Sequence, residues 1–142
     1  AVLQWREERT NGFFAAAMGR HVGAGADRLT AFYAALRELL GDPDFRGCCF
    51  INAAVEIADP DHPAFRFVQG QKRRFHSFLA GIVEEAVGRP APQLAEAAAV
   101  LTDGAIVTAV IRRSPAPADT AGEAVRRLVS AAVVPAPAKK PP

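Results

Sequence analysis

Residues 92–113 form the most apolar segment of the chain, and this segment constrains the fold more than any other feature. Its leucine, alanine, valine and isoleucine side chains face several directions around a helix, so no clear polar face is left. A helix of this kind is normally buried on more than one side. In a chain of 142 residues, we expect the second side to pack against another subunit. A strand is the alternative prediction, because the segment contains the β-branched residues Ile106, Val107, Val110 and Ile111.

The rest of the chain repeats apolar residues at the three- and four-residue spacing of helices. Gly41 stands where a C-terminal cap belongs, Asp61 or His62 where an N-terminal cap belongs, and Gly88 begins a break. Residues 48–57 fit a short helix or a buried strand, and we favour a helix because no second strand with a hairpin turn lies nearby. We therefore predict an all-α fold of about six helices, at residues 1–22, 27–40, 48–57, 63–87, 92–113 and 118–134.

Charge and composition exclude several classes of protein. Half of the residues are hydrophobic and 23% are charged, which is typical of a packed domain. The formal net charge is +2, and Lys139 and Lys140 account for it, so the body of the chain lacks a basic nucleic-acid footprint. We find no signal peptide and no apolar run of the roughly 20 residues that a membrane span needs. The adjacent Cys48 and Cys49 indicate reduced, buried thiols in a cytoplasmic protein.

No set of side chains for catalysis or cofactor binding stands out. His21, His62 and His76 lie far apart in the sequence, and no serine sits in a nucleophile-elbow pattern. A phosphate-binding glycine loop is not found either. Asp59, Asp61 and His62 resemble a metal-ligand cluster, but the neighbouring prolines favour helix capping. We therefore expect no enzymatic activity, no cofactor and no metal.

Several short motifs follow one another between residues 47 and 105. The first is Gly47-Cys48-Cys49-Phe50-Ile51-Asn52-Ala53-Ala54-Val55-Glu56, and Asp59-Pro60-Asp61-His62-Pro63 follows it. A long helix then carries Lys72-Arg73-Arg74, and the apolar segment carries Leu101-Thr102-Asp103-Gly104-Ala105. In this order the motifs resemble the effector domain of TetR-family transcriptional regulators, over roughly residues 29–133. Cys49 departs from the pattern, since many relatives place a proline or another apolar residue there.

The resemblance implies three parts. Residues 1–24 would be a connector helix that follows an N-terminal helix-turn-helix domain, which we expect to be absent because no residue here matches it. Residues 25–134 would be the ligand-binding and dimerisation domain, and residues 135–142 a disordered tail of proline, alanine and lysine. The implied partners are a second copy of the chain, a small-molecule effector, and DNA through the helix-turn-helix domain alone.

The candidates for binding the effector are chosen mainly from the aromatic residues of the chain. A small-molecule pocket is mostly apolar with a few orienting polar groups, although plain core packing explains any single aromatic equally simply. The wider set of pocket candidates is Trp5, Phe13, Phe32, Phe65 and Phe67, with the polar Glu56 and His76. The predicted ligand contacts are Phe14, Met18, Tyr33, Cys49, Phe50, Asn52, Phe75, Phe78 and Thr102.

The resemblance also implies that the last two helices of each subunit form a four-helix bundle. The predicted dimer interface consists of Leu101, Ala105, Thr108, Ala109, Arg112, Val125, Leu128, Val129 and Ala132.

Two polar residues lie inside apolar segments and need partners. Asn52 bonds either a ligand or a helix end, and the sequence favours neither. Asp103 needs a cation from Arg37, Lys72 or Arg73, because a buried unpaired carboxylate is costly. Lys72-Arg73-Arg74 itself is expected to be a solvated face.

Three hypotheses for function follow. The first is an effector domain in which a small apolar ligand allosterically controls DNA binding by the parent regulator. The second is a helical enzyme subunit, and the third is a bare dimerising scaffold with a fully packed interior.

Overall fold

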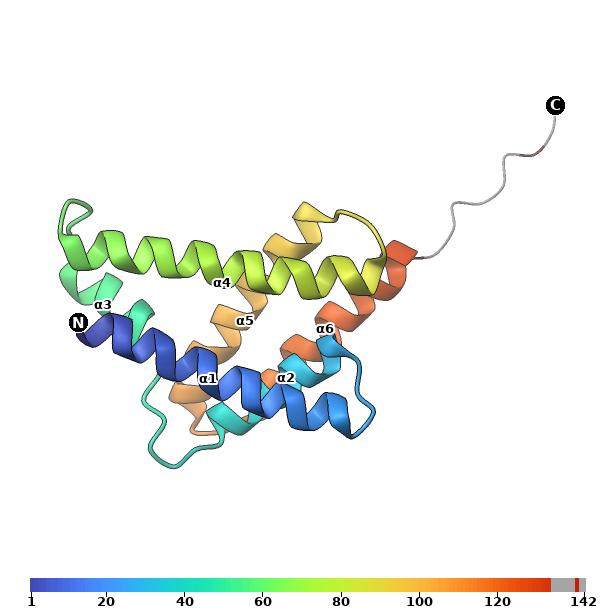
Figure 1. Cartoon of the computed structure of the whole chain (residues 1–142), viewed down its shortest axis with the longest axis horizontal. Helices are drawn as coiled ribbons and strands as arrows, with labels where there is room; N and C mark the ends of the chain where they lie inside the picture. The colour runs from blue at the N-terminus through green and yellow to red at the C-terminus, as the bar shows by residue number, and fades with distance from the viewer. Residues whose placement is uncertain (134–139, 141–142) are drawn as a thin grey trace.

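A computed structural model describes residues 1–133 and residue 140. These residues form six helices and no strand, so the all-α prediction is confirmed (Figure 1). The strand alternative for residues 92–113 is wrong, and the preference for a helix at residues 48–57 is confirmed. The predicted tail, residues 135–142, lies outside the described residues except for residue 140. The helices are α1 (Val2–Gly23), α2 (Arg28–Leu40), α3 (Cys49–Ile57), α4 (Pro63–Val87), α5 (Pro92–Arg112) and α6 (Ala116–Val133).

Local hydrogen bonds explain where the helices begin and end. Asp27 caps α2, because its Oδ1 accepts a hydrogen bond from the backbone N–H of Thr30 at 2.9 Å. His62, rather than Asp61, caps α4 through Nδ1, and Pro63 occupies the first turn. Gly88 ends α4 in the left-handed conformation, at φ +81°. The last helix begins at Ala116, two residues earlier than predicted, because the Ser114 hydroxyl accepts from the Ala116 N–H.

Helix α2 supplies the centre of the core. Figure 1 shows α4 spanning the molecule from α3 at one end to α6 at the other, with α1 and α2 on the opposite side and α5 between them. Phe32 and Leu36 of α2 are fully buried, as are Leu79 of α4 and Val125 of α6. The core therefore joins most of the helices and includes the C-terminal half of α1, where Ala17 is buried.

Helices α2 and α6 approach each other at a glycine. A Cβ placed on Gly122 of α6 would lie 2.9 Å from Cγ of Tyr33 on α2, which is closer than side chains approach. The small residue therefore permits the contact between these two helices. Tyr33 is itself buried, and its hydroxyl lies 3.1 Å from Thr102 Oγ1 of α5.

Helix α5 has one buried and one exposed apolar side. Its small residues Ala95, Ala98, Thr102, Ala105 and Ala109 face the core. Large apolar side chains on the other side, including Val107 and Ile111, are exposed. By length and composition alone α5 could cross a membrane, and 33% of its most apolar 18-residue window is buried. The sequence expectation that no segment reaches such a length is therefore wrong for α5.

Candidate ligand-binding cavity and dimer face

A cavity of about 1010 Å³ lies among five of the helices. Its walls come from α1, the end of α2, the loop at residues 42–48, the start of α3, the middle of α4 and the middle of α5. Apolar residues from this set include Leu36, Phe45 and Ile106, none of which the sequence analysis selected. Ligand pockets in proteins typically have volumes of about 300–1,000 Å³, so the cavity has room for a drug-sized molecule.

Aromatic rings form much of the cavity wall. Phe14 of α1 and Phe75 and Phe78 of α4 all line it. Phe14 stacks on the buried Phe32, with ring centroids 5.4 Å apart, and Phe32 lies 6.2 Å from both Phe75 and Phe78. Helical spacing explains the grouping: Phe75 and Phe78 are three residues apart on one face of α4, and Met18 follows Phe14 by four on α1.

The structure brings all the predicted ligand contacts except Tyr33 to the cavity wall. Tyr33 lies behind the wall and reaches it only through its hydrogen bond to Thr102. Burial raises the pKa of Tyr33, although the bond to Thr102 opposes the shift. The predicted contacts that line the cavity are Phe14, Met18, Cys49, Phe50, Asn52, Phe75, Phe78 and Thr102.

The wider candidate set divides in the structure. Phe13 lines the cavity and Phe32 supports the wall, whereas Phe65, Phe67, Glu56 and His76 are not among its lining residues. Trp5 also lies off the cavity, about half exposed, with the guanidinium of Arg9 4.8 Å from its ring centroid.

A partly buried ion pair between α4 and α5 lines the cavity. Lys72 Nζ donates to Asp103 Oδ1 at 2.5 Å, and both side chains are partly buried. Lys72 is thus the partner that Asp103 required, whereas Arg37 pairs with Asp119 instead. The expectation that residues 72–74 form a solvated face is wrong for Lys72, because α5 brings a carboxylate to it.

Asn52 is exposed, contrary to its predicted burial within an apolar segment. Its Nδ2 lies 3.4 Å from the backbone carbonyl oxygen of Arg46, so the side chain helps to hold the loop before α3. Gly47 in this loop has φ +94°, a conformation that favours glycine. Asn52 still reaches the cavity because α3 begins at its edge.

The two cysteines lie at the start of α3 and line the cavity as half-buried free thiols. Burial raises the pKa of the Cys49 thiol, and the neighbouring Cys48 adds to the rise. A helix N-terminus by itself lowers the pKa of a thiol, but desolvation of the thiolate is the larger effect here. Cys49 is therefore mainly a neutral thiol at neutral pH.

Gln71 is a cavity residue that the sequence analysis missed. Its side chain is 8% exposed, and its Oε1 is buried without a hydrogen-bond partner among the described residues. It precedes Phe75 by four residues, so it lies on the same face of α4. This four-residue spacing is the one feature of the sequence that could have identified Gln71 as a cavity residue.

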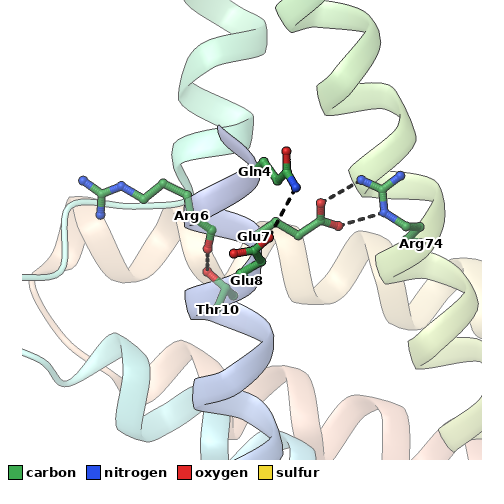
Figure 2. Close-up of polar contacts among 6 residues, drawn as sticks. All are labelled: Gln4, Arg6, Glu7, Glu8, Thr10 and Arg74. Carbon is green, nitrogen blue, oxygen red and sulfur yellow. Dashed lines mark hydrogen bonds and ion pairs between the residues drawn. The ribbon is translucent and has the colours of Figure 1, made fainter. Parts of the chain in front are cut away.

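An ion pair joins α1 to α4 at the edge of the cavity. Figure 2 shows the Glu7 carboxylate facing the Arg74 guanidinium, whose Nε and Nη2 donate to its two oxygens, each at 2.8 Å. The Glu7 side chain is 14% exposed, and its hydrogen bonds raise the pKa of Arg74 above the usual value. The pair fastens the N-terminal half of α1, whose other polar contacts in Figure 2 stay within the helix.

Of Asp59, Asp61 and His62, the structure confirms helix capping for His62, while the two aspartates bond within the turn and to Arg66. Asp59 Oδ1 accepts from the Asp61 N–H at 3.0 Å, Asp61 pairs with Arg66, and His62 caps α4. Within the described part of the chain, no group of three or more potential metal-ligating side chains was found.

The members of the predicted dimer interface differ in how much surface they expose on the single chain. Four of its members, Ala105, Ala109, Val125 and Val129, are buried in the core of a single chain and have little surface left for a partner. Leu101, Thr108 and Ala132 are partly buried, and Arg112 and Leu128 are exposed. The exposed stripe of α5 lies one position earlier than predicted, at Val100, Gly104, Val107 and Ile111.

Comparison with known proteins agrees with this architecture. The structure aligns with that of SCO4454, a TetR-family transcriptional regulator from Streptomyces coelicolor, with a TM-score of 0.73, 20% sequence identity, and coverage of 85% of this chain and 66% of the other. The six-helix fold is therefore that of a TetR-type regulator.

Residues 25–125 match the family model described as the tetracyclin repressor-like C-terminal domain, and the chain belongs to this family. Curated relatives include the HTH-type transcriptional regulator YjdC of Escherichia coli K12 and its namesake in Shigella flexneri. Each is 28% identical over 94 residues, which is 66% of this chain and 49% of the relative. The chain thus spans about half the length of the curated relatives that it matches.

Proposed function

We propose that this chain is the effector-sensing and dimerisation domain of a TetR-type transcriptional regulator that works in the bacterial cytoplasm. A small, mostly apolar ligand binds in the cavity and controls DNA binding by a helix-turn-helix domain. The cavity of about 1010 Å³ with its aromatic wall is the observation that carries the proposal, because close-packed cores contain few voids larger than a water molecule.

The position of α1 supports allosteric control. Several residues of α1 between Arg6 and Val22 line the cavity, so a ligand there contacts the helix that would connect to the DNA-binding domain. A ligand shifts a conformational equilibrium only by its differential affinity for the two states. Contacts with α1 would provide such a difference if α1 takes different positions in the two states.

The exposed apolar face of α5 supports dimerisation. Val100, Gly104, Val107 and Ile111 follow one another at alternating intervals of four and three residues, the spacing of a packed helical seam. Gly104 lets a partner helix approach closely. Leu128 of α6 is also exposed and extends the apolar surface. A second copy, packed through α5 and α6 as a four-helix bundle, would cover it.

The ligand-binding part of the proposal is tested with N-phenyl-1-naphthylamine, a neutral apolar probe that fluoresces when desolvated. We expect saturable binding of one probe per chain. Gly19 lines the cavity, and its Cβ position is open, so Gly19→Trp should fill space and weaken binding at least about tenfold. Gly12 also has an open Cβ position on α1 but does not line the cavity, so Gly12→Trp should leave affinity unchanged.

Two outcomes would contradict this assignment. If the wild-type chain binds no probe, the dimerising scaffold becomes the better description of the fold. If the two tryptophan variants lose affinity equally, the probe binds α1 or another surface and not this cavity.

A further inference from the structure

The cavity wall contains one buried polar atom that no other described residue satisfies, Oε1 of Gln71. Gln71 lines the cavity beside Phe75 and Phe78 on the same face of α4. A buried acceptor without a partner destabilises the structure that contains it, and native proteins leave few of them. Gln71 lines the cavity, and a rotation of its terminal amide would present this acceptor to a ligand donor there.

The other polar groups in the buried and partly buried part of the cavity wall, those of Thr102, Lys72 and Asp103, already have partners. Thr102 Oγ1 donates to the Ala98 carbonyl at 2.7 Å and contacts the Tyr33 hydroxyl. Lys72 and Asp103 neutralise each other. The buried and partly buried part of the wall therefore offers neither an unpaired cation nor an unpaired carboxylate to a ligand.

The exposed charged residues that line the cavity do not provide a counter-ion for a ligand either. Arg74 is bound by Glu7, and the guanidinium of Arg6 lies 5.3 Å from the Trp5 ring centroid. Both groups are exposed, as are the other charged residues that line the cavity, so their charges are hydrated and screened. These other residues are Arg9, Arg28, Asp42, Asp44 and Arg46. A charged ligand would lose its own hydration inside the cavity without gaining a buried counter-ion.

We propose that Gln71 determines ligand specificity, and that the cavity takes an uncharged aromatic molecule with a hydroxyl or N–H group that donates to Gln71 Oε1. This inference rests on the proposed ligand-binding function and adds the chemical class of the ligand. The apolar body lies against the aromatic wall, and the single donor fixes its orientation.

The test compares two neutral probes with the same ring system by isothermal titration calorimetry at pH 7. 2-Naphthol carries a donor, and 2-methoxynaphthalene retains the oxygen but cannot donate. The wild-type chain should bind 2-naphthol about fivefold more tightly, which corresponds to one ordinary hydrogen bond. The anion 2-naphthoate should bind more weakly than either.

Three glutamine variants assign the preference to Gln71. Gln71→Met keeps the length of the side chain and should remove the preference, mainly through weaker naphthol binding. Gln69→Met, on an exposed site of the same helix, should preserve it. Gln71→Leu provides a second apolar replacement, and circular dichroism establishes that each variant is folded. Because the orphan atom is lost, Gln71→Met should also raise Tm by about 3 °C without any probe.

Equal affinity of the wild-type chain for the two neutral probes would overturn the proposal, as would a preference that persists in both Gln71 variants. Tightest binding by 2-naphthoate would overturn it in favour of an anionic ligand. If any of these results occurs while N-phenyl-1-naphthylamine still binds saturably, the role of Gln71 is contradicted and the cavity's general role stands. If the wild-type chain binds none of the four probes, the proposed function itself is contradicted.

Discussion

At the scale of single residues, a buried hydroxyl pair supports the cavity from behind. Tyr33 and Thr102 join α2 to α5, and Thr102 returns a hydrogen bond to its own helix. The aromatic periodicity of α2 identified Tyr33 as an inward-facing residue, but the sequence could not show whether its hydroxyl faced the cavity or the core. That distinction depends on which side of α2 the neighbouring α5 occupies.

Titration of Tyr33 tests this burial directly, because the chain contains one tyrosine. Ultraviolet absorbance of tyrosinate should give a pKa above 10 for the native protein and about 10 in denaturant. Because the folded pKa is raised, the contribution of Tyr33 to stability is complete below pH 10 and is lost as the pH rises through the folded pKa. A native pKa at or below 10 would mean that the hydroxyl is solvated.

Gly122 makes a second prediction at this scale. Gly122→Ala should lower the free energy of unfolding by about 1–2 kcal/mol, because the clash with Tyr33 outweighs the better helix propensity of alanine. Gly81 of α4 has no neighbour within 4 Å of its Cβ position, so Gly81→Ala should stabilise the protein by about 0.5–1 kcal/mol. Urea denaturation measures both. If Gly122→Ala is also stabilising, α2 and α6 are not packed as closely as described.

At the scale of the helices, the sequence predicted existence and limits well because caps and periodicity are local. Pro63–Val87 was predicted at its observed limits, since a histidine cap, a proline and a glycine mark its ends. The orientation of α5 was less accessible. Apolar residues surround this helix on all sides, so periodicity could not tell the core-facing alanines from the exposed valines. The predicted interface was consequently displaced from the exposed stripe by one residue.

The polar residues of the cavity were harder to predict for a related reason. Lys72 lies in a run of three basic residues that suggests a solvated face, yet α5 brings Asp103 to it. Gln71 has no sequence feature that separates it from the exposed Gln69, apart from its spacing from Phe75. Both assignments depend on contacts between distant segments, which composition and local spacing do not contain.

The Glu7–Arg74 pair makes a prediction for helix α1. Glu7→Gln removes the charge that holds α1 against α4, so amide hydrogen exchange in the N-terminal half of α1 should accelerate while the core keeps its protection. Glu8→Gln is the matched control, because Glu8 bonds only Gln4 on the same helix. Added salt should weaken the difference between wild type and Glu7→Gln. Equal exchange in both variants would show that packing alone holds α1.

At the scale of the whole molecule, helix α5 lies between the cavity and an exposed apolar face. The cavity lies between α1 and α4, and α5 separates it from the exposed stripe of Val100, Gly104, Val107 and Ile111. Asp103 and Ile106 of α5 line the cavity, while Val107 faces outward. One helix therefore contacts both the proposed ligand and the proposed partner subunit, so dimer geometry and ligand occupancy should influence each other.

The matched variants for the dimer face use two equally exposed apolar residues. Ile111 of α5 is 77% exposed and lies on the stripe, and Val55 of α3 is 75% exposed and lies away from it. Ile111→Glu should disrupt the four-helix bundle by placing a carboxylate in its apolar seam. Val55→Glu should leave association unchanged.

Sedimentation equilibrium across a concentration series, without detergent, measures the mass of the wild-type chain and these variants. We expect a dimer that persists at low micromolar concentration for the wild type and Val55→Glu, and a folded monomer for Ile111→Glu. A wild-type chain that remains monomeric at every concentration would contradict the account, because the apolar face of α5 would then have no partner subunit.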